Sequence, residues 1–220
     1  PVYDLLEIGA GGGSIARVND LGLLQVGPDS ASSEPGPASY GLGGSLPTVT
    51  DADLLLGYLN PDYFLGGQMR LDSSAAHSAV SDNLSDATGL TPIAAAAGVH
   101  ELVNENMASA ARMYVAEKGQ APSKLSLVAF GGAGPVHAVG LARKLGCPQV
   151  IVPPFSGVMS SLGLLAAPVA FERSRAVRQI VSALDLDAIE ATFGELEGEA
   201  SSLMPDDAPV LVRRSVDLRY

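Results

Sequence analysis

A short apolar strand, a glycine-rich turn, a helix and a second apolar strand follow one another in the second half of the chain, and this order constrains the fold more than any other stretch. The run 125–130 is apolar, rich in β-formers, and ends in the glycines that precede Pro135. Proline suits the first turn of a helix, which the apolar spacing predicts up to Gly146. A second apolar strand is predicted at 149–153. Such a β-loop-α-β unit builds a parallel sheet and predicts an α/β fold.

The loop of this unit carries three glycines. Gly131, Gly132 and Gly134 lack Cβ atoms, so they permit positive φ and would let a ligand lie against bare backbone beside the free N–H groups of the helix start. In parallel sheets, ligands bind at this end of the strands. A tight turn that only packs closely explains the same glycines equally well, because the loop is neither GxGxxG nor the phosphate loop that ends in Gly-Lys-Ser/Thr. Ligand binding and close packing therefore both stay open.

A second glycine-rich loop lies near the N-terminus, at residues 9–14. It follows a predicted strand at 5–8, and the strand on its far side is expected to form a hairpin with 23–26. Gly11 and Gly12 lose much conformational entropy on folding unless the backbone must bend sharply or approach a ligand. The Ser14 hydroxyl could donate to a ligand oxygen or bond to its own backbone. These three residues are candidate binding residues, with a turn as the alternative.

Two aspartates mark the start of a helix predicted at 52–59, for which Thr50 or Asp51 is the expected N-cap. The preceding segment, 27–46, has little predicted regular structure, which is typical of a lid or a binding loop. Asp51 and Asp53 could bind a metal ion or position a water molecule, because carboxylates suit hard cations. Their favourable interaction with the helix dipole is the simpler interpretation. Asp51 is retained as the candidate catalytic and metal-binding residue.

Polar residues interrupt two of the other predicted helices. A helix capped by Asp72 is predicted to run to residue 84, and a longer one to run from 91 to 118. In the longer helix His100 and Asn104 lie among apolar positions, where a solvated face or a satisfied core hydrogen bond is commoner than a site. His137 falls in the first turn of the helix after the three glycines. We expect it to pack or cap rather than to act as an acid–base catalyst.

Charge and composition exclude several classes of partner. The chain has 220 residues and a formal net charge of −11, which disfavours binding to a phosphate backbone, so no nucleic-acid partner is expected. It has no run of 18 apolar residues and no leader-like start, so no membrane partner is expected. Cys147 is the only cysteine, which fits a reducing compartment. The expected location is the cytoplasm.

The last third of the chain alternates short predicted elements. The pattern predicts a turn and a short apolar helix at 153–165, a strand-like run at 169–177, an acidic amphipathic helix at 184–203 and a strand at 210–220. Because the final predicted strand reaches the last residue, we expect the chain to be a fragment of a longer protein, cut at both ends.

Seven stretches, taken together, resemble the hydantoinase A / 5-oxoprolinase / acetone carboxylase β-subunit family. They follow the family's order across almost the whole chain and are IGAGGGSIA (Ile8–Ala16), VGPDSASSEPGPASYGLGG (Val26–Gly44), PTVTDADLLLGYL (Pro47–Leu59), NENMASA (Asn104–Ala110), AFGGAGPVHA (Ala129–Ala138), PPFSGVMSSLGLL (Pro153–Leu165) and DLRY (Asp217–Tyr220). The chain departs from the family's pattern at 31–34, where Glu34 adds a charge, and at 160–161, where the second serine replaces the commoner alanine.

The resemblance implies an ATPase lobe of the actin/hexokinase/Hsp70-like type, with a ribonuclease H-like mixed sheet and flanking helices. Residues 1–178 would be the second lobe, and 179–220 the truncated start of a C-terminal domain. The glycines at 131–134 would then border the adenosine side of ATP, and the loop at 9–14 would line the cleft between the lobes. The family's two aspartate-bearing phosphate loops, of the DxGGT type, are absent from this sequence, and with them the clamp for Mg²⁺ (or Mn²⁺). This chain alone is therefore expected to be inactive.

The function implied by the resemblance is part of an ATP-dependent cyclic-amide hydrolase, of the hydantoinase or 5-oxoprolinase type, which activates an amide carbonyl by phosphorylation. Two alternatives stay open: an ATP-using carboxylase subunit of the acetone carboxylase type, and a non-catalytic nucleotide-binding module. The expected partners are a small cyclic amide and a second large subunit or domain of the same enzyme. A homo-oligomer is also compatible with the sequence.

Overall fold

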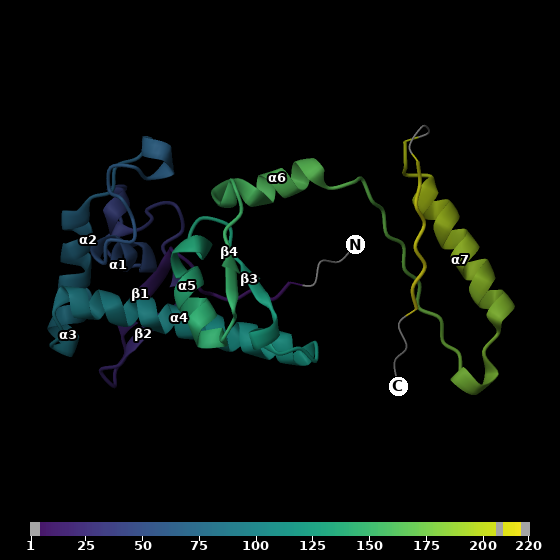
Figure 1. Ribbon diagram of the computed structural model, residues 1–220, viewed down its shortest axis with the longest axis horizontal. Helices are drawn as coiled ribbons and strands as arrows, with labels where there is room; N and C mark the ends of the chain where they lie inside the picture. The colour runs from purple at the N-terminus through teal and green to yellow at the C-terminus, as the bar shows by residue number, and fades with distance from the viewer. Residues whose placement is uncertain (1–4, 206–208, 217–220) are drawn as a thin grey trace. The chain divides into compact units, whose positions relative to one another are not determined.

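The computed structural model describes residues 5–205 and 209–216, which contain helices and short strands. The chain divides into two compact units: the larger spans Leu5–Gly163 and the smaller begins at Leu164 (Figure 1). The expected boundary at residue 178 stays a prediction. The mixed α/β character agrees with the predicted fold class. Within the described residues, however, the strands form two separate two-stranded sheets and no larger mixed sheet.

The regular elements are short, apart from one long helix. The strands are β1 (Ser14–Val18), β2 (Leu24–Ser30), β3 (Ser126–Val128) and β4 (Gln149–Ile151). The α-helices are α1 (Val49–Leu55), α2 (Ser73–Val80), α3 (Asp86–Thr88), α4 (Pro92–Glu117), α5 (Gly134–Leu145), α6 (Met159–Ala166) and α7 (Leu186–Ser201). A π-helical turn (Ser81–Ser85) joins α2 to α3, and single 3₁₀ turns occur at Ala38–Tyr40, Leu65–Gly67, Pro122–Lys124, Ser156–Val158 and Val181–Ala183.

The first sheet is the predicted hairpin. β1 and β2 pair antiparallel, with Ala16 opposite Val26, and both of these side chains are buried in the core. The ladder is irregular between Ser14 and Ala16, where β1 leaves the glycine-rich loop. The strand predicted at 5–8 is wrong. Those residues have no partner strand in the described structure, and an apolar run forms a strand only where a neighbour completes its hydrogen bonds.

The β-loop-α-β unit is confirmed. β3 and β4 pair in parallel, with Ser126 opposite Gln149, and α5 connects them. The helix ends as predicted at Gly146, which has φ 71° and supplies the left-handed cap that glycine adopts without strain. The loop between β3 and α5 thus lies at the carboxyl end of β3, as the sequence predicts.

The N-termini of α1 and α2 are fixed by side-chain caps. Thr48 caps α1 in a capping box with Asp51, so the predicted N-cap at Thr50 or Asp51 is wrong by two or three residues. Asp72 caps α2 as predicted by accepting hydrogen bonds from Ser74 N and Ala75 N. The helix predicted to end at residue 84 leaves the α-helical form at Ser81, where the π-helical turn begins.

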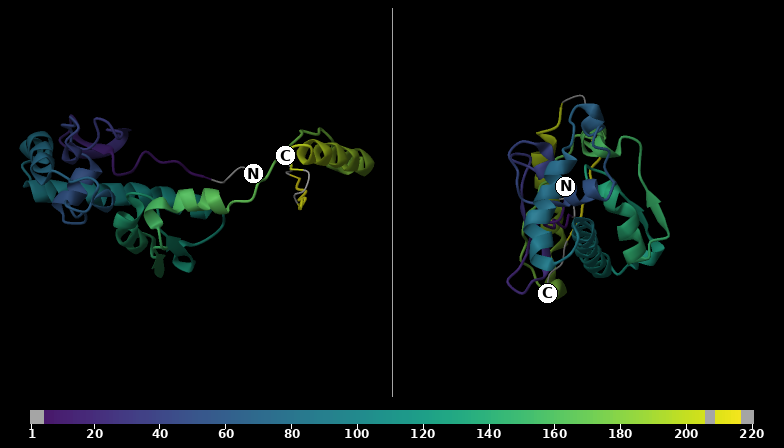
Figure 2. Two further views of the ribbon diagram at one scale, coloured as in Figure 1. Left: turned by 90° about the horizontal axis from the view of Figure 1, so that it is seen from above. Right: turned by 90° about the vertical axis from the view of Figure 1, so that its left-hand side faces the viewer.

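The 26-residue helix α4 organises the larger unit (Figure 1, Figure 2). It begins at Pro92 after the cap Thr91, close to the predicted start, and it packs against α1, β2 and α5. Its core face is built mainly from alanine and valine side chains, which let neighbouring elements approach closely, with two polar side chains among them. The buried members of this face are Ala95, Ala96, Val99, His100, Val103, Asn104 and Ala108.

The smaller unit contains the predicted acidic helix as α7. Two arginines from extended segments bind its acidic side chains: Arg175 pairs with Glu195 and Glu199, and Arg214 pairs with Glu190 and Glu197. The strands predicted at 169–177 and 210–216 are wrong, because neither segment has a strand partner within the described residues; the rest of the second prediction, 217–220, lies outside them. In the part of the chain that the structure covers, none of the helices combines the length and apolarity needed to cross a bilayer.

Candidate functional site

The glycine loop after β3 presents bare backbone on its open side. Gly131 has φ 92°, and its N–H donates to Ser156 O at 2.8 Å, which anchors the loop. A Cβ atom added at Gly131, Gly132 or Gly134 would meet no atom of the described residues within 4 Å. The positive φ of Gly131 favours glycine by itself, whereas neither close packing nor a positive φ requires glycine at Gly132 and Gly134; a ligand that lies against the loop would.

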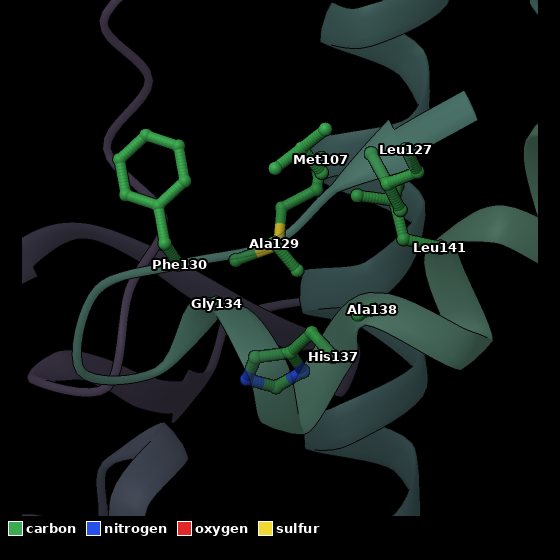
Figure 3. Close-up of a pocket in the computed structure, with 9 residues that line it drawn as sticks. Met107, Leu127, Ala129, Phe130, Gly134, His137, Ala138 and Leu141 are labelled. Atoms are coloured by element: carbon green, nitrogen blue, oxygen red, sulfur yellow. The ribbon is translucent and has the colours of Figure 1, made fainter. Parts of the chain in front are cut away.

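An apolar pocket of about 150 Å³ lies beside this loop (Figure 3). Phe130 of the loop, Met107 of α4, and His137 and Leu141 of α5 contribute to its walls. Small-molecule sites usually enclose roughly 300–1,000 Å³. The pocket is thus too small to enclose a nucleotide without further surfaces.

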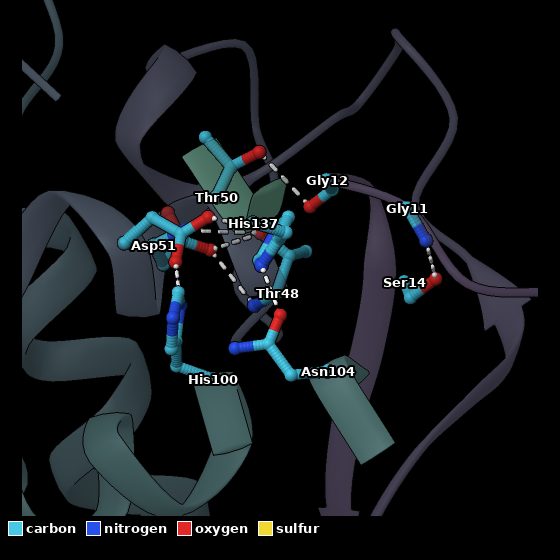
Figure 4. A network of polar contacts seen from close by, with 10 residues as sticks. Gly11, Gly12, Ser14, Thr48, Thr50, Asp51, His100, Asn104 and His137 are labelled. Atoms are coloured by element: carbon cyan, nitrogen blue, oxygen red, sulfur yellow. Dashed lines mark hydrogen bonds and ion pairs between the residues drawn. The ribbon is translucent and has the colours of Figure 1, made fainter. Parts of the chain in front are cut away.

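The two glycine-rich loops meet. A Cβ atom on Gly12 would lie 3.6 Å from the Ala133 side chain, an ordinary contact, and 2.7 Å from Thr50 Oγ1, so the close approach of Thr50 favours glycine at this position. The main-chain N–H and the hydroxyl of Thr50 both donate to Gly12 O, at 2.8 and 2.9 Å (Figure 4). Gly11 borders open space. Residues that the sequence analysis assigned to two separate loops therefore belong to one surface.

Ser14 stabilises the turn of the first loop. Its hydroxyl accepts a hydrogen bond from Gly11 N at 3.0 Å and donates to Gly9 O at 3.4 Å, and the residue is buried. This arrangement is the turn alternative that the sequence left open. A ligand role for Ser14 stays a prediction and would require the hydroxyl to exchange one of these partners.

Asp51 lies fully buried at the start of α1, where four donors surround its carboxylate. Thr48 N, Thr48 Oγ1 and Ala38 N donate to Oδ2 at 2.9, 2.8 and 3.2 Å, and Ser39 N donates to Oδ1 at 2.8 Å. The carboxylate thus ties the segment 27–46 to the first turn of α1. Its role as a catalytic or metal-binding residue stays a prediction, and the geometry favours the capping role.

Tyr40 lies on the same segment, against the start of α1. Burial raises the pKa of its hydroxyl, the nearby charge of Asp51 adds to the increase, and a hydrogen bond with Thr50 opposes it. The group is thus held in its neutral form by its surroundings. Together with Asp51 it makes this part of the long loop a fixed structure.

A second group of buried polar side chains gathers where α1, α4 and α5 meet (Figure 4). Asp53 of α1 is 2% exposed, His100 of α4 7%, and His137 of α5 1%. Asp53 Oδ1 lies 2.7 Å from His100 Nδ1, and Asp53 Oδ2 lies 3.3 Å from His137 Nε2. The fully buried Asn104 stands one helical turn after His100, and its Oδ1 lies 3.1 Å from His137 Nδ1.

Aromatic contacts fix the two imidazole rings of this group. The rings of His100 and His137 stack with their centroids 4.9 Å apart, and Tyr58 stacks on His100 at 4.7 Å. Sequence reasoning recognised these residues only singly, as a possible ligand, a polar interruption and a capping side chain. Their convergence depends on the packing of three helices, although the spacing of His100 and Asn104 already placed both on one face of α4.

Exposed charges hold α5 along α4 next to this group. Lys144 Nζ lies 2.9 Å from Glu101 Oε2 and 3.2 Å from Glu105 Oε2, and Arg112 Nη1 lies 3.1 Å from Glu105 Oε1. The hydrogen bond from Arg112 is the main cause of a lowered pKa for Glu105, and that from Lys144 is the second. The two carboxylates raise the pKa of Lys144 in turn.

Comparison with known proteins identifies the family. The sequence model of the family described as hydantoinase/oxoprolinase matches residues 1–173. The chain belongs to the hydantoinase/oxoprolinase family. This confirms the resemblance seen in the sequence motifs.

The relatives described below are identical to this chain at a third to nearly half of the aligned positions. Caprolactamase subunit alpha from Pseudomonas jessenii is 34% identical over an alignment that covers 100% of this chain and 33% of the relative. The acetophenone carboxylase gamma subunit from Aromatoleum aromaticum is 46% identical over 72% of this chain and 21% of the relative. The chain thus spans a third or less of these relatives.

Two solved structures have the same fold over most of the chain. Nucleotide-free acetone carboxylase, described in a study of ATP-dependent acetone carboxylation, matches with a TM-score of 0.71 and 33% identity over 88% of this chain and 28% of the solved one. The ATP-dependent caprolactamase from Pseudomonas jessenii matches with a TM-score of 0.69 and 34% identity over 89% and 28%. The two solved relatives are thus an acetone carboxylase and a caprolactamase, and both are described as ATP-dependent.

Proposed function

We propose that this chain is the second nucleotide-binding lobe of an ATP-dependent enzyme that hydrolyses cyclic amides. In this proposal ATP phosphorylates the amide carbonyl oxygen, which makes the carbon more electrophilic before water opens the C–N bond. Membership of the hydantoinase/oxoprolinase family supports it, as does the alignment of caprolactamase subunit alpha with the whole chain. The lobe would have the actin/hexokinase/Hsp70-like fold and extend to about residue 178.

The observation that carries the proposal is the open backbone of the loop at 131–134. A Cβ atom added at any of its three glycines would meet no described atom within 4 Å, and α5 begins directly at Gly134. The loop at 9–14 touches the same surface through Gly12 and Ala133. Gly131, Gly132 and Gly134 would then border the adenosine part of ATP, with Gly11, Gly12 and Ser14 along the edge of the cleft.

The phosphate side of the nucleotide would be bound by other parts of the protein. Residues 1–220 contain no DxGGT motif, the pocket beside the loop is small, and the oxygens of Asp51 are occupied by four donors. Mg²⁺ (or Mn²⁺) would therefore bind with the phosphates on the other lobe, and this chain alone would lack turnover. The relatives' names, subunit alpha and gamma subunit, support a partner subunit that completes the enzyme.

A carboxylase subunit is the second candidate. The 46% identity to the acetophenone carboxylase gamma subunit favours it, since this exceeds the identity to the caprolactamase subunit. The two functions differ in what triggers phosphate release from ATP by the complete enzyme. Release that depends on a lactam or hydantoin supports the hydrolase, and release that depends on a ketone and bicarbonate supports the carboxylase.

Nucleotide binding is tested by calorimetry on the complete natural protein with Mg²⁺-ATP. We expect Gly132→Val to weaken binding at least tenfold, because its side chain would extend into the space above the loop, where an added Cβ meets no described atom within 4 Å. Gly194→Val on the exposed side of α7 is the matched control, since that glycine also borders open space. Equal ATP affinity of the Gly132 variant and the control would contradict the assignment of the loop.

A further inference from the structure

We propose that Asp53, His100 and His137 bind one divalent transition-metal ion of the Zn²⁺ type, at a site separate from the one proposed for nucleotide-bound Mg²⁺. The three side chains come from α1, α4 and α5, and each offers one ligand atom, all within 4.8 Å of one another. All three are buried, so the site lies inside the larger unit rather than on its surface.

The orientation of His137 is the first argument. Its Nδ1 lies 3.1 Å from Asn104 Oδ1, and with the amide in this orientation Nδ1 donates and Nε2 presents a lone pair, while Asn104 Nδ2 has no hydrogen-bond partner among the described residues. Nε2 has no hydrogen-bond partner among the residues that the structure describes, although His137 is buried; Asp53 Oδ2 lies 3.3 Å away without hydrogen-bond geometry. A lone pair and a carboxylate oxygen that face each other in the core need a proton or a metal ion between them, and a metal ion would use the ligand atoms of all three side chains.

The spacing of the ligand atoms is the second argument. In a tetrahedral site with bonds of about 2.0 Å, ligand atoms lie roughly 3.3 Å apart. The separation between His137 Nε2 and Asp53 Oδ2 equals this value, and His100 Nδ1 lies 2.7 Å from the other carboxylate oxygen. Small side-chain movements would therefore place all three around one ion.

The type of ligand selects the type of ion. Two imidazoles and one carboxylate suit Zn²⁺, Fe²⁺ or Co²⁺, whereas Mg²⁺ prefers oxygen ligands and keeps several waters. Neither a lysine nor an arginine is paired with Asp53 among the described residues, so its partners there are imidazoles. One transition-metal ion would neutralise the negative charge of the buried Asp53 carboxylate and bind both imidazoles.

The surroundings have the features that support metal ligands. Asn104 orients His137 through the ring nitrogen that faces away from the ion, and Tyr58 stacks on His100. Gly140 makes the close approach of α5 possible, because a Cβ there would lie 2.8 Å from Asn104 Nδ2. The metal would thus join α1, α4 and α5 in the interior of the larger unit.

The test is metal binding by the complete natural protein after treatment with EDTA. Zn²⁺ is quantified by elemental analysis after gel filtration, and Co²⁺ is titrated while its visible absorption is recorded. We expect His100→Gln and Asp53→Asn each to hold one equivalent fewer than the wild type. Asn104→Ala should keep the ion but bind it about 10- to 100-fold more weakly, as expected for a residue that positions a ligand.

His77 provides the matched control, because it is an exposed histidine on α2 away from the cluster. His77→Gln should bind as much metal as the wild type. In His100→Cys, bound Co²⁺ should show an intense thiolate charge-transfer band that the wild type lacks, which reports ligation at that position directly. Wild-type metal content equal to that of both ligand variants would overturn the proposal.

X-ray absorption of the Zn²⁺-loaded wild type decides the question if the variants do not fold. A Zn²⁺ coordination shell that contains two imidazoles supports the site. A coordination shell without imidazole, or a protein that retains no Zn²⁺, overturns it. These readouts do not involve ATP, so failure of the metal site and failure of the nucleotide-lobe assignment remain distinguishable.

Discussion

Replacing Asp51 by alanine should destabilise the larger unit by about 4 kcal/mol. The substitution removes four hydrogen bonds to a fully buried carboxylate, which come from Ala38 N, Ser39 N, Thr48 N and Thr48 Oγ1. Hydrogen bonds to a charged group contribute roughly 1.5–3 kcal/mol each, and a buried donor left unpaired costs about 1–3 kcal/mol. Four such bonds give an upper limit well above 4 kcal/mol, which water entering the space and relaxation of the loop would reduce.

Asp72 supplies the comparison, because it caps α2 from an exposed position with two hydrogen bonds of 2.8 and 2.9 Å. Asp72→Ala should cost about 1 kcal/mol, the usual effect of losing an exposed N-cap. Urea denaturation of the chain at pH 7, followed by far-UV circular dichroism, gives both values.

Two results would refute the capping assignment of Asp51. One is a loss no larger than that of Asp72→Ala. The other is that EDTA lowers the free energy of unfolding of the wild type as much as Asp51→Ala does, while EDTA has no further effect on the variant. The second result would support the metal role that the sequence analysis retained for this residue.

Three further changes test the packing and charges around the site. Leu84→Ala should lower the free energy of unfolding by about 3 kcal/mol, because it empties a fully buried position; a loss below about 1 kcal/mol in the same urea assay would contradict the assigned core. Gly140→Ala should cost about 1–3 kcal/mol by pressing on Asn104 Nδ2, 2.8 Å from the new Cβ, and a neutral effect would show that the helices can separate freely. Because its cationic partners lower the pKa of Glu105, that group stabilises the folded state above its unfolded pKa of about 4.3, and the contribution disappears as pH falls through the lower folded value. Glu105→Gln should therefore lower the thermal midpoint at pH 7 and have a smaller effect at pH 3, and an equal effect at both pH values would exclude the ion pairs as its cause.

Local sequence signals predicted the elements that depend on their own residues. The β3–α5–β4 unit, the start of α4 near Thr91 and the cap at Asp72 each have a turn, a proline or a capping side chain within a few positions. The start of α1 was misplaced although its signal was present, since Thr48 and Asp51 have the spacing of a capping box.

Strands and long-range clusters could not be predicted in the same way. The runs at 5–8 and 169–177 are apolar enough for strands, but pairing depends on a neighbour that the local pattern does not reveal. His100 and Asp53 are 47 residues apart, and Asn104 and His137 are 33 apart. Their contact results from the packing of α1, α4 and α5, which no spacing within one helix encodes.

The open side of the glycine loop also predicts how the sequence can drift. Gly12 and Gly140 are held by the fold itself, because a methyl group at either would lie less than 3.0 Å from another atom of the chain. Gly132 and Gly134 have no such constraint, so mutation should exchange them for alanine or serine over evolutionary time if folding were all that mattered. Glycine retained at these two positions across lineages would indicate selection for contact between the loop and a ligand or a surface outside this chain.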